Sequence, residues 1–250
     1  VAIAGRAATV ADAGDADAST FSASYVVVAA DVTEGTASLS IAFSDLASNP
    51  GVTVTSVTDG SAVTIDLTPP TLTVVTMSSD NTGHTSRANA GDTITVSITA
   101  NEAIVAPTVL IAGQSATVSG SGASYTATYT VQASDTGSDG AVASVSVAFT
   151  DLASNDGATV TALTAGSGVT IDLTAPSLTT VTMVSSNAGD GALANAGDTI
   201  TVSLTADEAI LAPTVTIAGQ SAAVSGGGTS YTATYTVQGS QVASSDGSAA

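Results

Sequence analysis

Short runs of alternating apolar and polar residues recur along the whole chain, and turns rich in Gly, Asn and Asp separate them. Alternation with a period of two is typical of β-strands that bury one face. Between residues 69 and 174 the pattern predicts seven strands, at residues 72–77, 93–99, 108–111, 116–119, 124–132 and 143–150 and in the stretch 159–173. The inward-facing positions predict one shared core, formed by Ile94, Val96, Ile98, Tyr125, Tyr129, Val147, Phe149 and Ile171.

Two of these strands are irregular in sequence. Leu72, Val75 and Met77 break strict alternation, which predicts a β-bulge or a switch between sheets. At ~3.3 Å per residue, the stretch 159–173 is too long for one straight strand in so small a domain, so we expect residues 165–168 to kink it. Seven short antiparallel strands joined by turns predict an Ig-like sandwich.

The chain repeats itself with an offset of 106 residues. Residues 89–132 and 195–238 are identical at 37 of 44 positions, and residues 43–68 and 149–174 at 19 of 26. A unit of this length suits one β-sandwich domain. The predicted domains are an incomplete repeat over 1–68, a complete repeat over 69–174 and an incomplete repeat over 175–250. Because the outer repeats lack their first or last strands, we expect the chain to be part of a longer one.

Four segments carry a resemblance to a known family: TIDLTPP (64–70), TIDLTAP (170–176), TADEAI (205–210) and FTDLASN (149–155). They resemble bacterial Ig-like tandem repeats, which occur in large surface proteins and biofilm adhesins. The resemblance implies tandem seven-strand antiparallel β-sandwiches arranged as a linear rod, located outside the cell or on its surface. It also implies a structural or adhesive role, with neighbouring repeats as partners and calcium held by acidic residues near the junctions.

Composition narrows the chemistry further. The chain has 21 acidic residues, two Arg, no Lys, no Cys and one His, for a net charge of −19. Nucleic acid is not an expected partner, because phosphates require a basic patch. Most acid–base and nucleophilic mechanisms need His, Cys or Lys beside a partner, so we do not expect an enzyme. No apolar run approaches the ~20 residues that span a bilayer, so no membrane insertion is expected.

The acidic residues are not spread evenly. If successive strands alternate in direction, a linker, the loop after residues 93–99 and the loop after residues 143–150 all meet at one end of the complete repeat. Acidic clusters without a basic partner suit Ca²⁺, which takes hard oxygen ligands. The candidate ligands are Asp66, Glu102, Asp151 and Asn155 at the first junction, and Asp172, Asp207 and Glu208 at the second. The alternative is that these are ordinary turn residues, since Asp and Asn favour turns by themselves.

Two other functions stay open. Identical chains could form an extracellular filament or matrix by packing laterally or exchanging strands, because strand edges without Lys are poorly protected against pairing. A ligand-binding adhesin module would need an exposed apolar or aromatic patch, for which three per cent aromatic residues offer little material. His84 lies in a loop rich in Gly, Ser and Thr, and we expect it to be exposed rather than a ligand.

Overall fold

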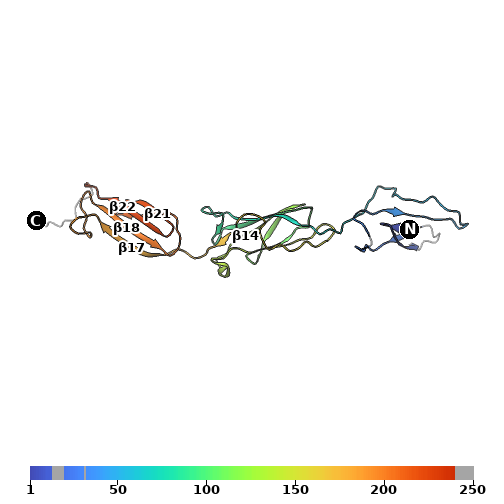
Figure 1. The fold of residues 1–250 in the computed structure, drawn as a ribbon, viewed down its shortest axis with the longest axis horizontal. Coiled ribbons are helices and arrows are strands. Elements are labelled where there is room, and N and C mark those ends of the chain that lie inside the picture. The colour runs from blue at the N-terminus through green and yellow to red at the C-terminus, as the bar shows by residue number, and fades with distance from the viewer. Residues whose placement is uncertain (13–19, 31, 240–250) are drawn as a thin grey trace. The chain divides into compact units, whose positions relative to one another are not determined.

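The structure is a computed structural model that describes residues 1–12, 20–30 and 32–239. Its regular elements in these ranges are β-strands and one 3₁₀ turn, Thr136–Ser138, so the chain is all-β as predicted. The chain divides into two compact units, Val1–Leu173 and Thr174–Ala250 (Figure 1). The end of the third predicted repeat, residues 240–250, lies outside the described residues.

Two antiparallel sheets form the central repeat. The first has the order β13–β14–β10–β8, with β8 at Leu72–Ser79, β10 at Thr93–Ala100, β13 at Thr117–Ser121 and β14 at Ser124–Thr130. The second has the order β12–β11–β15, with β11 at Thr108–Ile111, β12 at Gln114–Ser115 and β15 at Val145–Ala148. A short parallel pair joins β9, Arg87–Ala88, to β16, Thr170–Ile171.

Inward residues of both sheets share one core. Val96 of β10, Val109 of β11 and Val147 of β15 are at most 2% exposed and belong to the same cluster. Of the predicted core residues, all but Tyr129 are buried. Tyr129 is half-buried against the cluster because its hydroxyl reaches outward and donates to Asp135 Oδ2 at 2.6 Å.

The strand boundaries follow the alternation only in part. The predicted irregularity near Leu72 is confirmed, since the register between β8 and β10 shifts at Thr99 and Ala100. The stretch 159–173 forms no single strand. Val160 makes an isolated bridge to Val147, and the chain pairs again only at β16. Gly166, inside the predicted kink, adopts a φ of 80°, which interrupts an extended strand.

Residues 1–68 retain the second sheet of this arrangement. The strands are β1 at Ala2–Ile3, β2 at Arg6–Ala7, β3 at Thr9–Asp12, β4 at Phe21–Ser24, β5 at Gly35–Thr36, β6 at Leu39–Ser40 and β7 at Thr64–Ile65. The sheet β2–β1–β6 has the order of β12–β11–β15 in the central repeat. Strands β3 and β4 form a separate hairpin, and β5 pairs with β7.

The second unit retains the first sheet. Its strands are β17 at Leu178–Ser185, β18 at Thr199–Ala206, β19 at Thr216–Ile217, β20 at Gln220–Ser221, β21 at Ala223–Gly227 and β22 at Ser230–Thr236. Figure 1 labels the four strands of this sheet. The order β17–β18–β22–β21 matches β8–β10–β14–β13, and the register matches with the 106-residue offset. In the part of the chain that the structure describes, no helix is both long and apolar enough to cross a membrane.

Candidate metal site

Three carboxylates that are distant in sequence meet at one end of the central repeat. Asp66 follows β7, Glu102 follows β10 and Asp151 follows β15. One oxygen from each lies within 4.8 Å of the others, and within the described ranges this is the group of three that could hold a metal ion. The linker and the two loops therefore converge, as predicted from successive strands that alternate in direction.

The spacing of the three oxygens fits one calcium ion. Because Ca²⁺ binds oxygen at 2.3–2.6 Å, two ligands of the same ion lie no more than about 5 Å apart. Asp66 and Glu102 are half-buried and Asp151 is buried, so the cluster is open on one side to solvent, which can supply further ligands. The donor set, three carboxylates and no nitrogen, is the kind that hard cations prefer.

Asp151 is fixed by its own loop. Its Oδ1 accepts from the backbone N–H of Asn155 at 2.8 Å, and its Oδ2 accepts from Asn155 Nδ2 at 2.7 Å. Burial raises the pKa of Asp151, but the hydrogen bonds from Asn155, Ala153 and Ser154 outweigh it and hold the pKa below its usual range. The group therefore stays ionised in a position that is 1% exposed.

The same loop occurs in residues 1–68 without the cluster. Asp45 Oδ1 accepts from the backbone N–H of Asn49 at 2.8 Å, and Asp45 Oδ2 accepts from Asn49 Nδ2 at 2.8 Å. Asp45 is exposed there. The two hydrogen bonds between Asp and Asn are thus a property of the loop itself, as expected if these residues are ordinary turn formers. What distinguishes Asp151 is the approach of Asp66 and Glu102.

Asn155, a predicted ligand, enters the site as a hydrogen-bond donor. Besides its bond to Asp151, its Nδ2 donates to the backbone carbonyl of Asp66 at 3.1 Å. It therefore ties the linker to the loop and orients two of the three acidic residues toward each other. This role was not visible in the sequence, because it depends on a contact between residues 89 positions apart.

Further hydrogen bonds anchor the segments on either side of each linker. Leu67 N–H donates to Glu34 Oε1 at 2.9 Å, and Leu173 N–H donates to Asp139 Oδ1 at 2.7 Å. At the start of the next strand, Thr71 N–H donates to Asn101 Oδ1 at 2.7 Å. The offset of 106 residues, which relates Leu67 to Leu173, was the signal in the sequence that could have revealed this recurring anchor.

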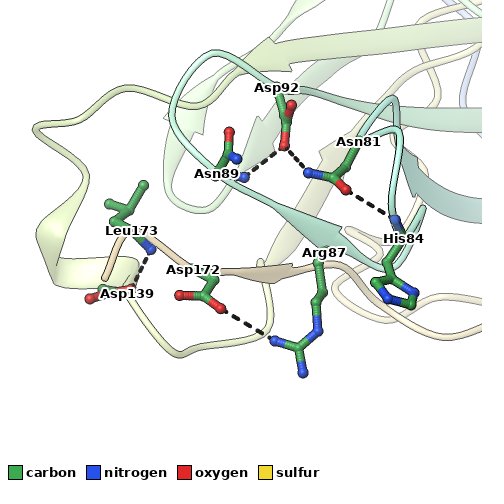
Figure 2. Close-up of polar contacts among 8 residues, drawn as sticks. All are labelled: Asn81, His84, Arg87, Asn89, Asp92, Asp139, Asp172 and Leu173. Carbon is green, nitrogen blue, oxygen red and sulfur yellow. Dashed lines mark hydrogen bonds and ion pairs between the residues drawn. The ribbon is translucent and has the colours of Figure 1, made fainter. Parts of the chain in front are cut away.

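The opposite end of the central repeat uses its acidic residues as structural acceptors. Figure 2 shows Asp92 between Asn81 and Asn89, with Oδ2 accepting from Asn81 Nδ2 at 2.7 Å and from the Asn89 N–H at 2.8 Å. His84 is exposed, as predicted, and its N–H donates to Asn81 Oδ1 at 3.0 Å. Asp198 repeats the arrangement of Asp92 with the same partners 106 residues later.

The second predicted ligand set has other partners within its own units. Asp172 forms an ion pair with Arg87 at 3.3 Å (Figure 2). Asp207 accepts from the backbone N–H and the hydroxyl of Ser177 at 2.8 and 2.7 Å, and these bonds hold its pKa below the usual range. Glu208 is half-buried. Calcium binding by Asp172, Asp207 and Glu208 stays a prediction.

Comparison of the chain with models of known protein families gave no match, and comparison with curated proteins gave none either.

Proposed function

We propose that the chain is a segment of an extracellular, non-catalytic stalk built from tandem Ig-like sandwiches, with calcium bound where the linker enters the central repeat. The observation that carries the proposal is the convergence of Asp66, Glu102 and Asp151 within 4.8 Å. The repeat itself supports a structural role, because near-identical units in series are typical of spacers.

The strand order supports the Ig-like assignment. In the order β13–β14–β10–β8, the four strands correspond to D, E, B and A of an Ig-like domain, and β11 and β15 correspond to C and F. The interrupted segment that ends in β16 takes the place of strand G. An Ig-like sandwich is expected to hold strands A, B, E and D in one sheet and C and F in the other, with one core between the two sheets.

Ion binding at this site would restrain the linker. Asp66 belongs to the linker, whereas Glu102 and Asp151 belong to loops of the folded repeat. A bound divalent cation supplies charge neutralisation for three carboxylates that otherwise repel one another. Asp151 and Asn155 hold their positions through the loop, so binding would restrict mainly Asp66 and hence the bending of the chain at this point.

The first experiment measures thermal unfolding with calcium and with chelator at matched ionic strength. With a Kd on the order of 10⁻⁴–10⁻³ M, 10 mM calcium should stabilise the central repeat by about 1.4–2.7 kcal/mol. Glu102→Gln should abolish the gain, and it removes charge without removing a hydrogen bond from the Asp151 loop. The matched control is Asp45→Asn, in the equivalent loop outside the cluster, which should leave the gain unchanged.

The stiffening role requires a second measurement. Small-angle scattering of the whole chain should give a larger maximum dimension and less flexibility with calcium than with chelator. If calcium stabilises the protein but the scattering curves coincide, the ion is bound without stiffening the chain. If neither measurement responds to calcium, the metal site is wrong and the acidic residues are turn formers only.

A further inference from the structure

Glu34 holds the linker, residues 66–71, to the preceding repeat in residues 1–65. Its Oε1 accepts from the backbone N–H of Leu67 at 2.9 Å and from the hydroxyl of Thr68 at 2.6 Å. The contact follows from the antiparallel pairing of β5 with β7, because Glu34 directly precedes β5 and the linker directly follows β7. The glutamate is therefore placed beside the point where the chain leaves the preceding repeat.

The complete central repeat makes the same contact with a different residue. Leu173, which lies 106 residues after Leu67, donates its N–H to Asp139 Oδ1 at 2.7 Å. The position 106 residues after Glu34 is Gly140, so the acceptor has moved by one residue and changed its type. Its target, the N–H of the leucine after the linker aspartate, is the same. The contact is therefore a feature of the repeat rather than of one local sequence.

Other contacts hold the linker to the central repeat, which follows it. Asn155 Nδ2 donates to the Asp66 carbonyl at 3.1 Å, and the Asp66 carboxylate is one of the three in the candidate metal site. At the other end of the linker, Thr71 N–H donates to Asn101 Oδ1 at 2.7 Å. The linker is thus held from both sides, and Glu34 acts from the side of the preceding repeat.

Two prolines make the linker stiff once its ends are fixed. Pro69 and Pro70 fix their own φ angles, and each disfavours a helical backbone at the residue before it. Bound calcium would fix Asp66 to the central repeat, and the bond to Asn101 already fixes Thr71. With calcium bound, the whole linker would therefore move together with the central repeat.

The remaining freedom lies where the linker begins. Ile65, the last residue of β7, is 7% exposed and moves with the preceding repeat. The backbone rotations on either side of the peptide bond from Ile65 to Asp66 therefore form a hinge between the two repeats. Glu34 crosses this hinge, because Leu67 and Thr68 lie beyond Asp66 in the chain.

We infer that Glu34 is a positioning residue that couples calcium binding to the orientation of the preceding repeat, an inference that rests on the proposed calcium site. When calcium is bound and Glu34 is in place, the two repeats are joined at two points, the backbone and the Glu34 hydrogen bonds, so rotation about the hinge is blocked. When calcium is bound without Glu34, the repeats are joined through the backbone alone and can still turn. Glu34 is therefore the residue through which the ion stiffens the chain.

Because the chain has no cysteine, two spin labels can report the movement of one repeat against the other. Ala7→Cys on β2 and Ser97→Cys on β10 are placed at exposed positions of the two repeats in the full chain, and each carries one nitroxide label. Pulsed electron paramagnetic resonance measures the distribution of distances between the labels. In the labelled parent chain, calcium should narrow this distribution compared with chelator at matched ionic strength.

Glu34→Ala should lose most of this narrowing, because it removes both hydrogen bonds across the hinge. It should keep the rise in unfolding temperature that calcium gives the central repeat, since Asp66, Glu102 and Asp151 are unchanged. Glu102→Gln should lose both effects. A residue that merely stabilised the preceding repeat would leave the narrowing by calcium in place, so the two readouts separate positioning from folding.

Further variants separate the hydrogen bonds of Glu34 from its charge. Glu34→Gln keeps a side-chain oxygen that can accept from Leu67 and Thr68, so it should retain the narrowing. Thr68→Val removes only the bond from the hydroxyl and should lose part of the narrowing. The matched control is Asp59→Asn, which should behave as the parent chain, because Asp59 Oδ1 accepts from the Ser61 N–H at 3.0 Å within its own turn.

The coupling role of Glu34 is overturned if calcium narrows the distribution in Glu34→Ala as much as in the parent chain. It is also overturned if Glu34→Ala loses the calcium-dependent rise in unfolding temperature, because Glu34 would then act on the ion site itself. A parent chain in which calcium changes neither readout would contradict the proposed calcium site, and the coupling role with it. The parent chain and the variant therefore distinguish the two failures.

Discussion

At the scale of single residues, burial depends on where a side chain's neighbours come from. The ring of Phe149 packs against Gly157, where a Cβ would overlap it, and is 6% exposed. The ring of Phe43 packs against Gly51 in the same way but is 54% exposed. The local contact is therefore intrinsic to the loop, and the rest of the burial is supplied by the opposite sheet.

Phe149→Ala should destabilise the central repeat by about 3–5 kcal/mol, because it opens a cavity in a closed core. Phe43→Ala should cost clearly less, since half of that ring is already in water. Hydrogen exchange of the β10 amides, read by mass spectrometry, measures the first variant. An equal loss of stability in the two variants would contradict the difference in packing.

Tyr129 should lose its hydroxyl proton at a higher pH than a tyrosine in the unfolded chain. Burial, together with the hydrogen bond and negative charge of Asp135, raises the pKa of Tyr129 to about 12. In the unfolded chain its pKa is about 10, so this stabilisation is complete below pH ~10 and is lost as the pH rises toward 12. Ultraviolet titration of the folded protein should lose its latest tyrosinate step in Tyr129→Phe. An unchanged titration would assign the late step to another tyrosine.

At the scale of elements, the same hairpin turn recurs in each repeat with a backbone that alanine disfavours. Ala4, Ala112 and Ala218 have φ values of 51°, 52° and 51°, and a glycine with positive φ follows each of them. Two successive residues with positive φ are typical of the type I′ turn, which fits the twist of the flanking strands. The turn geometry is retained although a non-glycine residue in this region costs about 1–2 kcal/mol.

Ala218→Asn should stabilise the hairpin β19–β20 by up to ~1 kcal/mol, because Asn tolerates the left-handed region and Ala218 is exposed. Ala218→Val should have the opposite sign, since a β-branched residue fits this region worst. Urea unfolding of the two variants beside the parent chain measures both. Stabilisation by valine would show that the turn does not hold this conformation in solution.

At the scale of the whole molecule, a net charge of −19 makes the folded state sensitive to proton and salt concentration. Hydrogen bonds lower the pKa of six described carboxylates in the folded protein. These are Glu34, Asp45, Asp59, Asp151, Asp198 and Asp207. Each carboxylate therefore favours the folded state only while it is ionised.

The unfolding temperature should fall as the pH drops below about 4. The lowered pKa values mean that stability is present above the unfolded-state pKa of about 4 and is lost as the pH passes through the lower folded-state values. Thermal unfolding followed by circular dichroism between pH 2 and 7 measures the effect. Asp151→Asn should reduce the fall of the unfolding temperature between pH 4 and pH 2. An unfolding temperature that is constant down to pH 2 would contradict this account.

Much of the fold and part of the candidate site could be predicted from the sequence alone. Period-two alternation identified Ile94, Val96 and Ile98 as core, because in a strand the side chain's face follows directly from its position. The alternating direction of successive strands placed Asp66 near Asp151, because antiparallel strands return every second loop to the same end. These are local or topological rules, and they hold wherever the strands form.

Only the tertiary structure decided the rest. Three contacts join segments that are roughly 80–90 residues apart. They are the parallel pairing of β9 with β16, the ion pair between Asp172 and Arg87, and the hydrogen bond from Asn155 to the Asp66 carbonyl. The 59% exposure of Val181, in a strand that is nearly identical to β8, agrees with the incomplete repeat that the sequence predicts over residues 175–250. A strand's sequence sets which face is apolar, but burial requires a second layer, and which segment supplies that layer is a property of the assembled fold.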